Sequence, residues 1–93
     1  MILTKSLEAR VLPSRVRHCR VGVVVAKYGH TIVERNRLRR QIRELARIRL
    51  IPSFTGIDLI IRALSSAYSS KFDELTRDVD QIKLGLTRNA SEE

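Results

Sequence analysis

Apolar residues recur at helical spacing between Thr31 and Leu50, and this is the clearest pattern in the chain. At about 3.6 residues per turn they fall on one side of a helix, and that face consists of Leu38, Ile42, Leu45 and Ala46. Thr31 and Glu34 have the spacing of a capping box. Pro52 lies where a helix must already have ended. The pattern predicts a helix over residues 31–50 that packs its apolar face on a sheet.

Strand patterns flank this helix on both sides. Residues 19–27 and 57–64 are almost continuously apolar and rich in β-branched side chains, which predicts two strands. The run at 21–26 indicates burial on both faces, or on one face with a partner on the other. Residues 7–12 alternate weakly and predict a further strand. Residues 14–20, with three arginines, predict a basic loop.

A last helix is predicted over residues 71–86. Ser70 and Asp73 have the spacing of a helix cap, and residues 87–93 read as a frayed tail. The predicted core face of this helix consists of Phe72, Leu75, Val79, Ile82 and Leu86. With one βαβ unit before it, the chain predicts a single α+β domain over residues 1–86, an α/β sandwich with helices against one sheet. By base rate such a crossover is right-handed.

Arginines occupy the side of the 31–50 helix that faces away from its apolar residues. Residues 35–49 hold seven arginines, no lysine and one acid, Glu44. The opposite side carries Asn36, Arg40, Arg43 and Arg47, with Arg37 and Arg39 on the flanks and Arg35 nearer the apolar side. Like charges at this spacing destabilise an isolated helix, and the planar guanidinium suits phosphate. We therefore expect a polyanionic partner rather than a plain solvated face.

Charge is distributed unevenly along the 93 residues, whose net charge is +8. Residues 1–57 carry 13 basic and 3 acidic side chains, a net of +10, whereas residues 58–93 carry 5 and 7, a net of −2. This asymmetry is typical of nucleic-acid binders. No apolar run reaches the ~18 residues of a membrane span, no signal-peptide pattern is present, and one cysteine, Cys19, cannot form an intrachain disulfide. A soluble cytoplasmic protein without membrane contact is predicted.

The sequence gives only weak support for catalytic or metal-binding residues. The acids of the last helix, at positions 73, 74, 78 and 80, are poorly placed to share a metal and are interpreted as solubilising. His18 adjoins Cys19, and His30 lies four residues before Glu34, but neither pair has a third ligand nearby. His30 is interpreted as a turn histidine, with contact to a phosphate at the helix N-terminus as the alternative. We expect no catalytic residue and no metal site in this chain.

One family matches these motifs. The segments RVGVVVAK (Arg20–Lys27) and VERNRLRRQIRELAR (Val33–Arg47), five residues apart, resemble the protein subunit of bacterial ribonuclease P. In that family a strand ends in a lysine, and a short loop leads to a helix with the pattern R-N-R-x-K/R-R-x-x-R-E, which Arg35 to Glu44 match. The segments GIDLIIRAL and KFDELTRDVDQI resemble the family's later strand and closing helix, so the resemblance covers roughly residues 7–86.

The resemblance implies a fold of the ribosomal protein S5 domain 2-like type with a left-handed crossover. It implies that an RNA subunit, with Mg²⁺ held by that RNA, removes the 5′ leader of precursor tRNA by endonucleolytic cleavage. The expected partners are the catalytic RNA and precursor tRNA, with no obligate protein partner. The expected RNA-binding residues are Lys27, Arg35, Asn36, Arg37, Arg39, Arg40, Arg43 and Arg47.

The sequence departs from the family pattern at its start. Family members carry a first helix and aromatic residues facing a cleft for the 5′ leader, whereas here no phenylalanine precedes Phe54. The chain is therefore expected to be a shortened form or to have a misplaced start. Two other functions compete: a structural rRNA-binding protein of similar fold with no nuclease role, and a DNA-binding module. The second is disfavoured because only Asn36 and Gln41 suit adenine edges.

Overall fold

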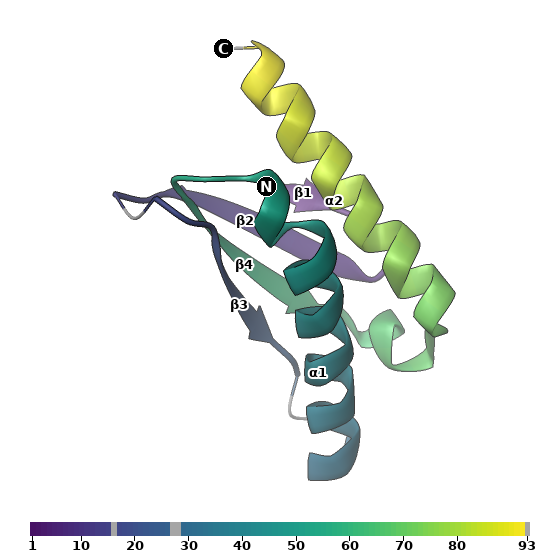
Figure 1. Cartoon of the computed structure of the whole chain (residues 1–93). Coiled ribbons are helices and arrows are strands. Elements are labelled where there is room, and N and C mark those ends of the chain that lie inside the picture. The colour runs from purple at the N-terminus through teal and green to yellow at the C-terminus, as the bar shows by residue number, and fades with distance from the viewer. Residues whose placement is uncertain (16, 27–28, 93) are drawn as a thin grey trace.

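The chain folds into one four-stranded sheet with two long helices on one of its faces (Figure 1). The computed structural model describes residues 1–15, 17–26 and 29–92, the last four as backbone only. The elements, in chain order, are β1 (Ile2–Leu3), β2 (Leu7–Pro13), β3 (Arg20–Val24), α1 (Ile32–Arg49), the 3-10 turn η1 (Ile51–Ser53), β4 (Ile57–Ala63), the 3-10 turn η2 (Ser65–Ser69) and α2 (Phe72–Glu92). The predicted α+β class is confirmed.

The sheet has the order β1-β2-β4-β3. β4 pairs antiparallel with β2 and parallel with β3, so α1 is the crossover between two adjacent parallel strands. Figure 1 shows α1 in front of the sheet, both parallel strands running downwards and β3 to the left of β4, which is a left-handed crossover. The base rate for such connections predicts the opposite hand, and the family resemblance implies the hand that is found.

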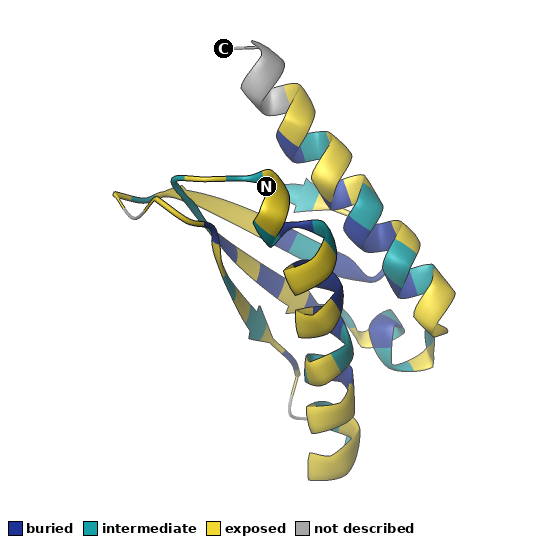
Figure 2. Cartoon of the chain, in the orientation of Figure 1, coloured by how far each residue is buried: buried dark blue, intermediate teal, exposed yellow. Residues whose placement is uncertain are grey.

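The core lies between the sheet and the two helices (Figure 2). Alternate strand residues point towards the helices because strand side chains alternate between the two faces. The buried residues of the sheet are led by Leu7, Ala9, Leu59, Ile61 and Ala63, and those of α1 are Leu38, Ile42, Leu45 and Ala46, as predicted. In α2 the predicted core face is buried except for Phe72, which is 49% exposed.

The opposite face of the sheet is open in the described chain. Val21 and Val23 are half-buried on the helix side, whereas Val24 is 51% exposed on the other. Of the two interpretations of the apolar run, burial on both faces is therefore wrong. Among the helices described, none combines the length and apolarity that crossing a bilayer requires.

Most predicted bounds fall within one or two residues of those observed. Thr31 caps α1, with Thr31 Oγ1 accepting from the Glu34 amide at 3.1 Å and Glu34 Oε1 accepting from the Thr31 amide at 3.2 Å. The strand predicted over residues 19–27 is shorter, and Lys27 lies outside the described residues. The frayed tail is wrong for residues 87–92, which continue α2 because they contain no glycine or proline to stop it.

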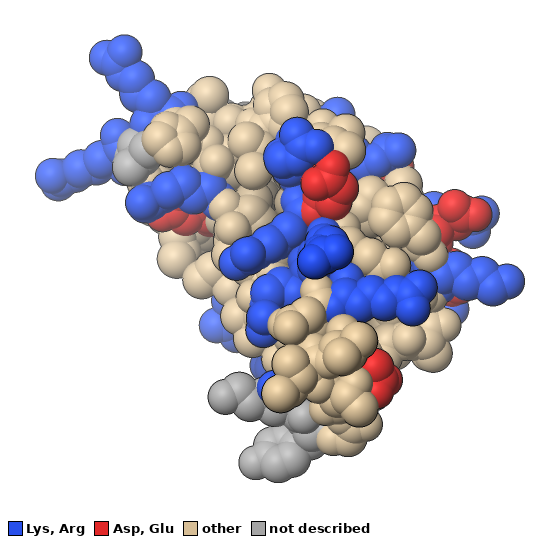
Figure 3. Space-filling view, turned by 60° about the horizontal axis from the view of Figure 1, so that its bottom comes forward, with Lys and Arg blue, Asp and Glu red and all other residues tan. Residues whose placement is uncertain are grey.

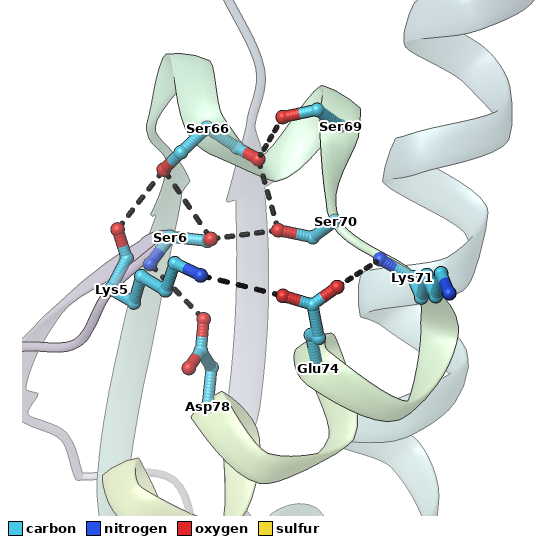
Figure 4. A network of polar contacts seen from close by, with 8 residues as sticks. All are labelled: Lys5, Ser6, Ser66, Ser69, Ser70, Lys71, Glu74 and Asp78. Carbon is cyan, nitrogen blue, oxygen red and sulfur yellow. Dashed lines mark hydrogen bonds and ion pairs between the residues drawn. The ribbon is translucent and has the colours of Figure 1, made fainter.

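The predicted cap at Ser70 is also wrong. α2 begins after Lys71, whose amide donates to Glu74 Oε1 at 3.1 Å. The Ser70 hydroxyl lies in a polar network (Figure 4), where it donates to the Ser66 carbonyl at 2.9 Å and lies 2.9 Å from the Ser6 hydroxyl. This network joins the turn before β2 to η2, and thereby fixes the position from which α2 starts.

The same network contains a buried carboxylate. Asp78 of α2 is 6% exposed, and its Oδ2 accepts the amide of fully buried Ser6 at 3.1 Å (Figure 4). Asp80 is paired with Arg49 of α1, whose Nη1 lies 2.8 and 3.0 Å from the two carboxylate oxygens. The interpretation of these two acids as solubilising is therefore wrong, because each connects elements distant in sequence.

Candidate nucleic-acid interface

α1 presents its arginines on the side facing away from the core. Residues three and four apart share a face of a helix, so burying the apolar positions turns the arginine positions outwards. The exposed members of the predicted set are Asn36, Arg37, Arg40, Arg43 and Arg47, while Arg35 and Arg39 are half-buried. Figure 3 shows Lys and Arg side chains crowded on one face of the molecule. A shallow surface hollow is lined by Asn36, Arg39, Arg40, Arg43, Glu44 and Arg47.

The arginines of this face have few partners within the chain. Arg37, Arg40 and Arg43 make no hydrogen bond or ion pair with the residues that the structure describes. Arg47 forms a two-pronged pair with Glu44, at 2.6 Å from Nη2 and 3.3 Å from Nε. These hydrogen bonds hold the pKa of the Glu44 carboxyl below its ordinary value. Because the pair is exposed, water and salt screen it, and three guanidiniums remain open to a partner.

The two half-buried members of the set, Arg39 and Arg35, differ in their hydrogen bonding. Arg39 Nη1 donates to Asn36 Oδ1 at 3.2 Å, which orients both side chains along the hollow. Arg35 has a buried Nε with no hydrogen-bond partner in the described part of the chain, a costly condition unless an acceptor is supplied. Lys27 of the predicted set, and Tyr28 beside it, lie outside the residues described. The structure therefore brings seven of the eight predicted residues onto one helix.

The start of α1 is held by an aromatic contact that the sequence did not predict. The His30 ring stacks on Tyr68 of η2, with ring centroids 3.4 Å apart and planes 5° apart. The Tyr68 hydroxyl donates to the Ala26 carbonyl at 2.8 Å. The Thr31 amide and hydroxyl, and then His30, hold the pKa of Glu34 below its ordinary value. His30 therefore orients the arginine helix and is more than a turn residue. The sequence signal for this contact is Tyr68, an aromatic residue within a segment of small residues.

Other surface hollows also carry cations. On the open face of the sheet, Arg10, Arg62, Val24 and Ile60 line one hollow. Arg10 and Arg62 were missed, although the alternation of polar and apolar residues in β2 and β4 could have revealed them. Another hollow lies where the loop between β2 and β3 meets the segment before β4.

The described residues contain no group of three or more His, Cys, Asp or Glu side chains with metal-binding geometry. Cys19 is 3% exposed, and burial followed by the nearby Asp58 charge raises the pKa of its thiol. A neutral buried thiol packs as a small apolar side chain. The chemistry that this surface supports is the binding of phosphate by arginine.

Curated relatives are similar to this chain over part of its length. The ribonuclease P protein component of Kocuria rhizophila is 42% identical over 59 residues, which is 63% of this chain and 52% of that protein. The component from Herpetosiphon aurantiacus is 32% identical over 72 residues, 77% of this chain and 58% of that protein. The chain thus spans about half the length of the curated relatives it matches.

Solved structures share the fold. The ribonuclease P protein of Staphylococcus aureus superposes with a TM-score of 0.79 at 20% identity, over 90% of this chain and 78% of that one. The protein from Thermotoga maritima gives a TM-score of 0.77 at 17% identity, over 87% and 79%. The family model described as Ribonuclease P matches residues 2–86. By this match over almost its entire length, the chain belongs to the ribonuclease P family.

Proposed function

We propose that this chain is the protein subunit of a ribonuclease P, in which it assists a catalytic RNA in removing the 5′ leader from precursor tRNA. The observation that carries the proposal is the exposed arginine row of α1, of which Arg37, Arg40 and Arg43 have no partner in the described chain. Family membership supplies the identity of the RNA. The partners proposed are the catalytic RNA and, through it, precursor tRNA, in the cytoplasm and without an obligate protein partner.

The proposed RNA-binding residues are Lys27, Arg35, Asn36, Arg37, Arg39, Arg40, Arg43 and Arg47. Those on α1 act as a preorganised phosphate-binding surface. α1 is anchored by its buried face, by the capping box and by the His30–Tyr68 stack, so its arginines are positioned before the RNA arrives. Each arginine that meets a phosphate releases condensed counterions, which makes the affinity depend steeply on salt. Neutralising phosphates in this way stabilises a compact RNA fold.

We place the cleavage chemistry on the RNA subunit, with Mg²⁺ held by that RNA. Mg²⁺ takes oxygen ligands in near-octahedral geometry, and the carboxylates of the described residues do not offer such a set. Asp58 is engaged by Arg20, Asp78 by the Ser6 amide and Asp80 by Arg49. The residues described therefore do not fit an Mg²⁺ site, and the part assigned to the protein is binding and charge neutralisation.

The test adds the chain to a bacterial ribonuclease P RNA and precursor tRNA at low magnesium concentration. We expect 5′ cleavage to increase with the unaltered chain, because bound arginines replace part of the phosphate neutralisation that magnesium otherwise supplies. Arg40→Gln/Arg43→Gln is expected to lose most of this increase. The matched variant Arg77→Gln/Arg88→Gln, which removes the same charge from exposed positions of α2, is expected to retain it.

A chain that binds the RNA without increasing cleavage would contradict the proposal. The alternative, a structural rRNA-binding protein of similar fold, predicts that outcome, together with tighter binding to rRNA fragments than to ribonuclease P RNA. Binding competition between the two RNAs therefore separates the two functions even where cleavage is low.

A further inference from the structure

A hollow beside the beginning of α2 has an exposed aromatic ring in its wall. Phe72 has the spacing of a core residue, yet it is 49% exposed and lines this hollow. The volume of the Phe72 hollow is about 440 Å³, which lies in the range of small-ligand sites, roughly 300–1,000 Å³. α1, η2 and the start of α2 supply its walls (Figure 1), and their polar and aromatic residues are led by Arg37, Gln41, Tyr68, Lys71 and Phe72. Of these five, the function proposed above uses only Arg37.

The walls of the Phe72 hollow are held in place by contacts within the chain. Arg37 and Gln41 are four residues apart, so they share one face of α1. Tyr68 is fixed by its stack on His30, with ring centroids 3.4 Å apart, and by the hydrogen bond from its hydroxyl to the Ala26 carbonyl at 2.8 Å. The shape of the hollow is therefore set before a ligand arrives.

The cations and the side-chain amide of this hollow are open to a ligand. Arg37 and Lys71 form no ion pair, and the Gln41 amide forms no hydrogen bond, with side chains that the structure describes. The acids nearby are engaged by helix caps: Glu34 accepts the amide of the residue that caps α1 at 3.2 Å, and Glu74 accepts the Lys71 amide at 3.1 Å. These backbone hydrogen bonds hold the pKa of both carboxyls below its ordinary value.

This combination of groups suits one nucleotide of a single-stranded RNA segment. An unpaired base stacks on an aromatic ring, and its polar edge forms hydrogen bonds with side chains such as amides. The arginine fork bonds two phosphate oxygens, and the lysine ammonium adds a point charge. An inorganic phosphate or an acidic peptide backbone would use the two cations and leave the exposed ring of Phe72 without a partner.

The Phe72 hollow is separate from the hollow along the arginine row. The two share no lining residue, although Asn36 of the arginine hollow and Arg37 of the Phe72 hollow are adjacent in the sequence. They therefore lie on two flanks of α1. An RNA backbone bound along the arginine row can turn one unpaired base into the Phe72 hollow.

We propose that the Phe72 hollow binds one unpaired nucleotide of the RNA, with the base stacked on Phe72, its edge on Gln41, and its phosphate at Arg37 and Lys71. For the identity of the RNA this inference rests on the proposed function; for its chemistry it requires only an unpaired nucleotide. The arginine row contacts phosphates, which carry no sequence information, whereas a base site requires a nucleotide that leaves the helical stack. The hollow therefore fixes the position of the protein along the RNA.

The first experiment compares Phe72→Ala with Leu84→Ala, a matched truncation at a position of α2 that is 59% exposed. Binding to a bacterial ribonuclease P RNA is measured over a series of KCl concentrations. Loss of one stacked base should weaken binding by about 5- to 150-fold and leave the slope of log affinity against log salt unchanged, because no phosphate contact is lost. Lys71→Gln should instead reduce the slope by about 0.7–0.9 units. Leu84→Ala and the ring-retaining Phe72→Tyr should keep both affinity and slope.

The second experiment uses Phe72→Trp, because the chain contains no tryptophan and the new indole reports on the hollow alone. A base stacked on the indole quenches its emission, so we expect quenching when ribonuclease P RNA is added. Quenching by AMP but not by the RNA would overturn the assignment, since the ligand would then be a free nucleotide. Quenching by neither would show that no base enters the hollow.

Failure of this inference differs from failure of the proposed function. If Phe72→Ala keeps its urea midpoint and its full affinity while Arg40→Gln/Arg43→Gln loses slope, the hollow takes no base and the proposed function stands. If the unaltered chain binds ribonuclease P RNA no more tightly than an unrelated RNA of equal length, the proposed function fails. Quenching of Phe72→Trp by the unrelated RNA then decides whether the hollow binds a nucleotide.

Discussion

Replacing Glu44 by glutamine removes the one carboxylate between Arg35 and Arg49. In the structure this carboxylate holds Arg47 through two hydrogen bonds, of 2.6 and 3.3 Å, on the exposed side of α1. A phosphate that approaches Arg47 must compete with Glu44 for the same guanidinium and also meets the negative charge of the carboxylate. Removing Glu44 therefore frees a fourth arginine beside Arg37, Arg40 and Arg43.

The size of the effect follows from this count. If each free arginine meets one phosphate, the slope of log affinity against log salt steepens by about 0.7–0.9 units when Arg47 is released. Over a fourfold change in salt, for example from about 50 to 200 mM KCl, such an increment corresponds to roughly a threefold additional loss of affinity. At the lower salt concentration the Glu44→Gln variant should bind more tightly than the unaltered chain.

Fluorescence anisotropy with labelled ribonuclease P RNA measures both quantities. Asp73→Asn is the matched control, because it removes one exposed acid from the first turn of α2, outside the hollow that Glu44 and Arg47 line. The control should shift affinity only through net charge and leave the slope unchanged. Equal slopes for Glu44→Gln and Asp73→Asn would refute the reasoning, since Arg47 would then not meet the RNA. Weaker binding by Glu44→Gln would also refute it and would show that Glu44 orients Arg47 for binding.

Three further predictions concern the support beneath this surface. Leu38→Ala, at a position 4% exposed, should cost about 2–5 kcal/mol of stability by urea unfolding, whereas Val33→Ala, at a position 76% exposed, should change stability by less than about 0.5 kcal/mol. Asp78→Ala leaves the buried Ser6 amide without an acceptor and should cost about 1–3 kcal/mol; Asp78→Asn, which keeps an acceptor oxygen, should cost less, and equal losses would contradict the assigned role. Hydrogen bonds lower the folded-state pKa of Glu34 and Asp58. Their contribution to the free energy of unfolding is therefore present above the ordinary carboxyl pKa of about 4, and is lost as the pH falls through the lower folded-state pKa values. A urea midpoint that stays constant as the pH falls through those values would be inconsistent with both contacts.

The arginine face could be predicted from the sequence because its causes are local. Helical periodicity assigns each residue of α1 to a face, and the capping box at Thr31 depends on residues three apart. Once Leu38 and Ile42 are assigned to the core, the exposed positions of Arg40 and Arg43 follow. β3 and β4 could be predicted for the same reason, since β-branched runs carry their signal within a few neighbouring residues.

The features that the sequence did not reveal depend on residues far apart in the chain. Asp78 contacts Ser6 across 72 positions, and Arg49 contacts Asp80 across 31. No spacing rule relates such pairs, so the sequence alone predicts that an acid on a helix is solvated. The crossover hand depends on the packing of whole elements, and β1, with two residues, is too short to show a period. The stack of His30 on Tyr68 is likewise a contact between elements.

The salt dependence of RNA binding tests the central claim most directly. For Arg40→Gln/Arg43→Gln we predict that the slope of log affinity against log KCl falls by about one unit per arginine, while circular dichroism and the urea midpoint stay as in the unaltered chain. An unchanged slope in a folded variant would mean that these guanidiniums face solvent in the complex, and the assignment of α1 as the RNA-binding surface would be wrong.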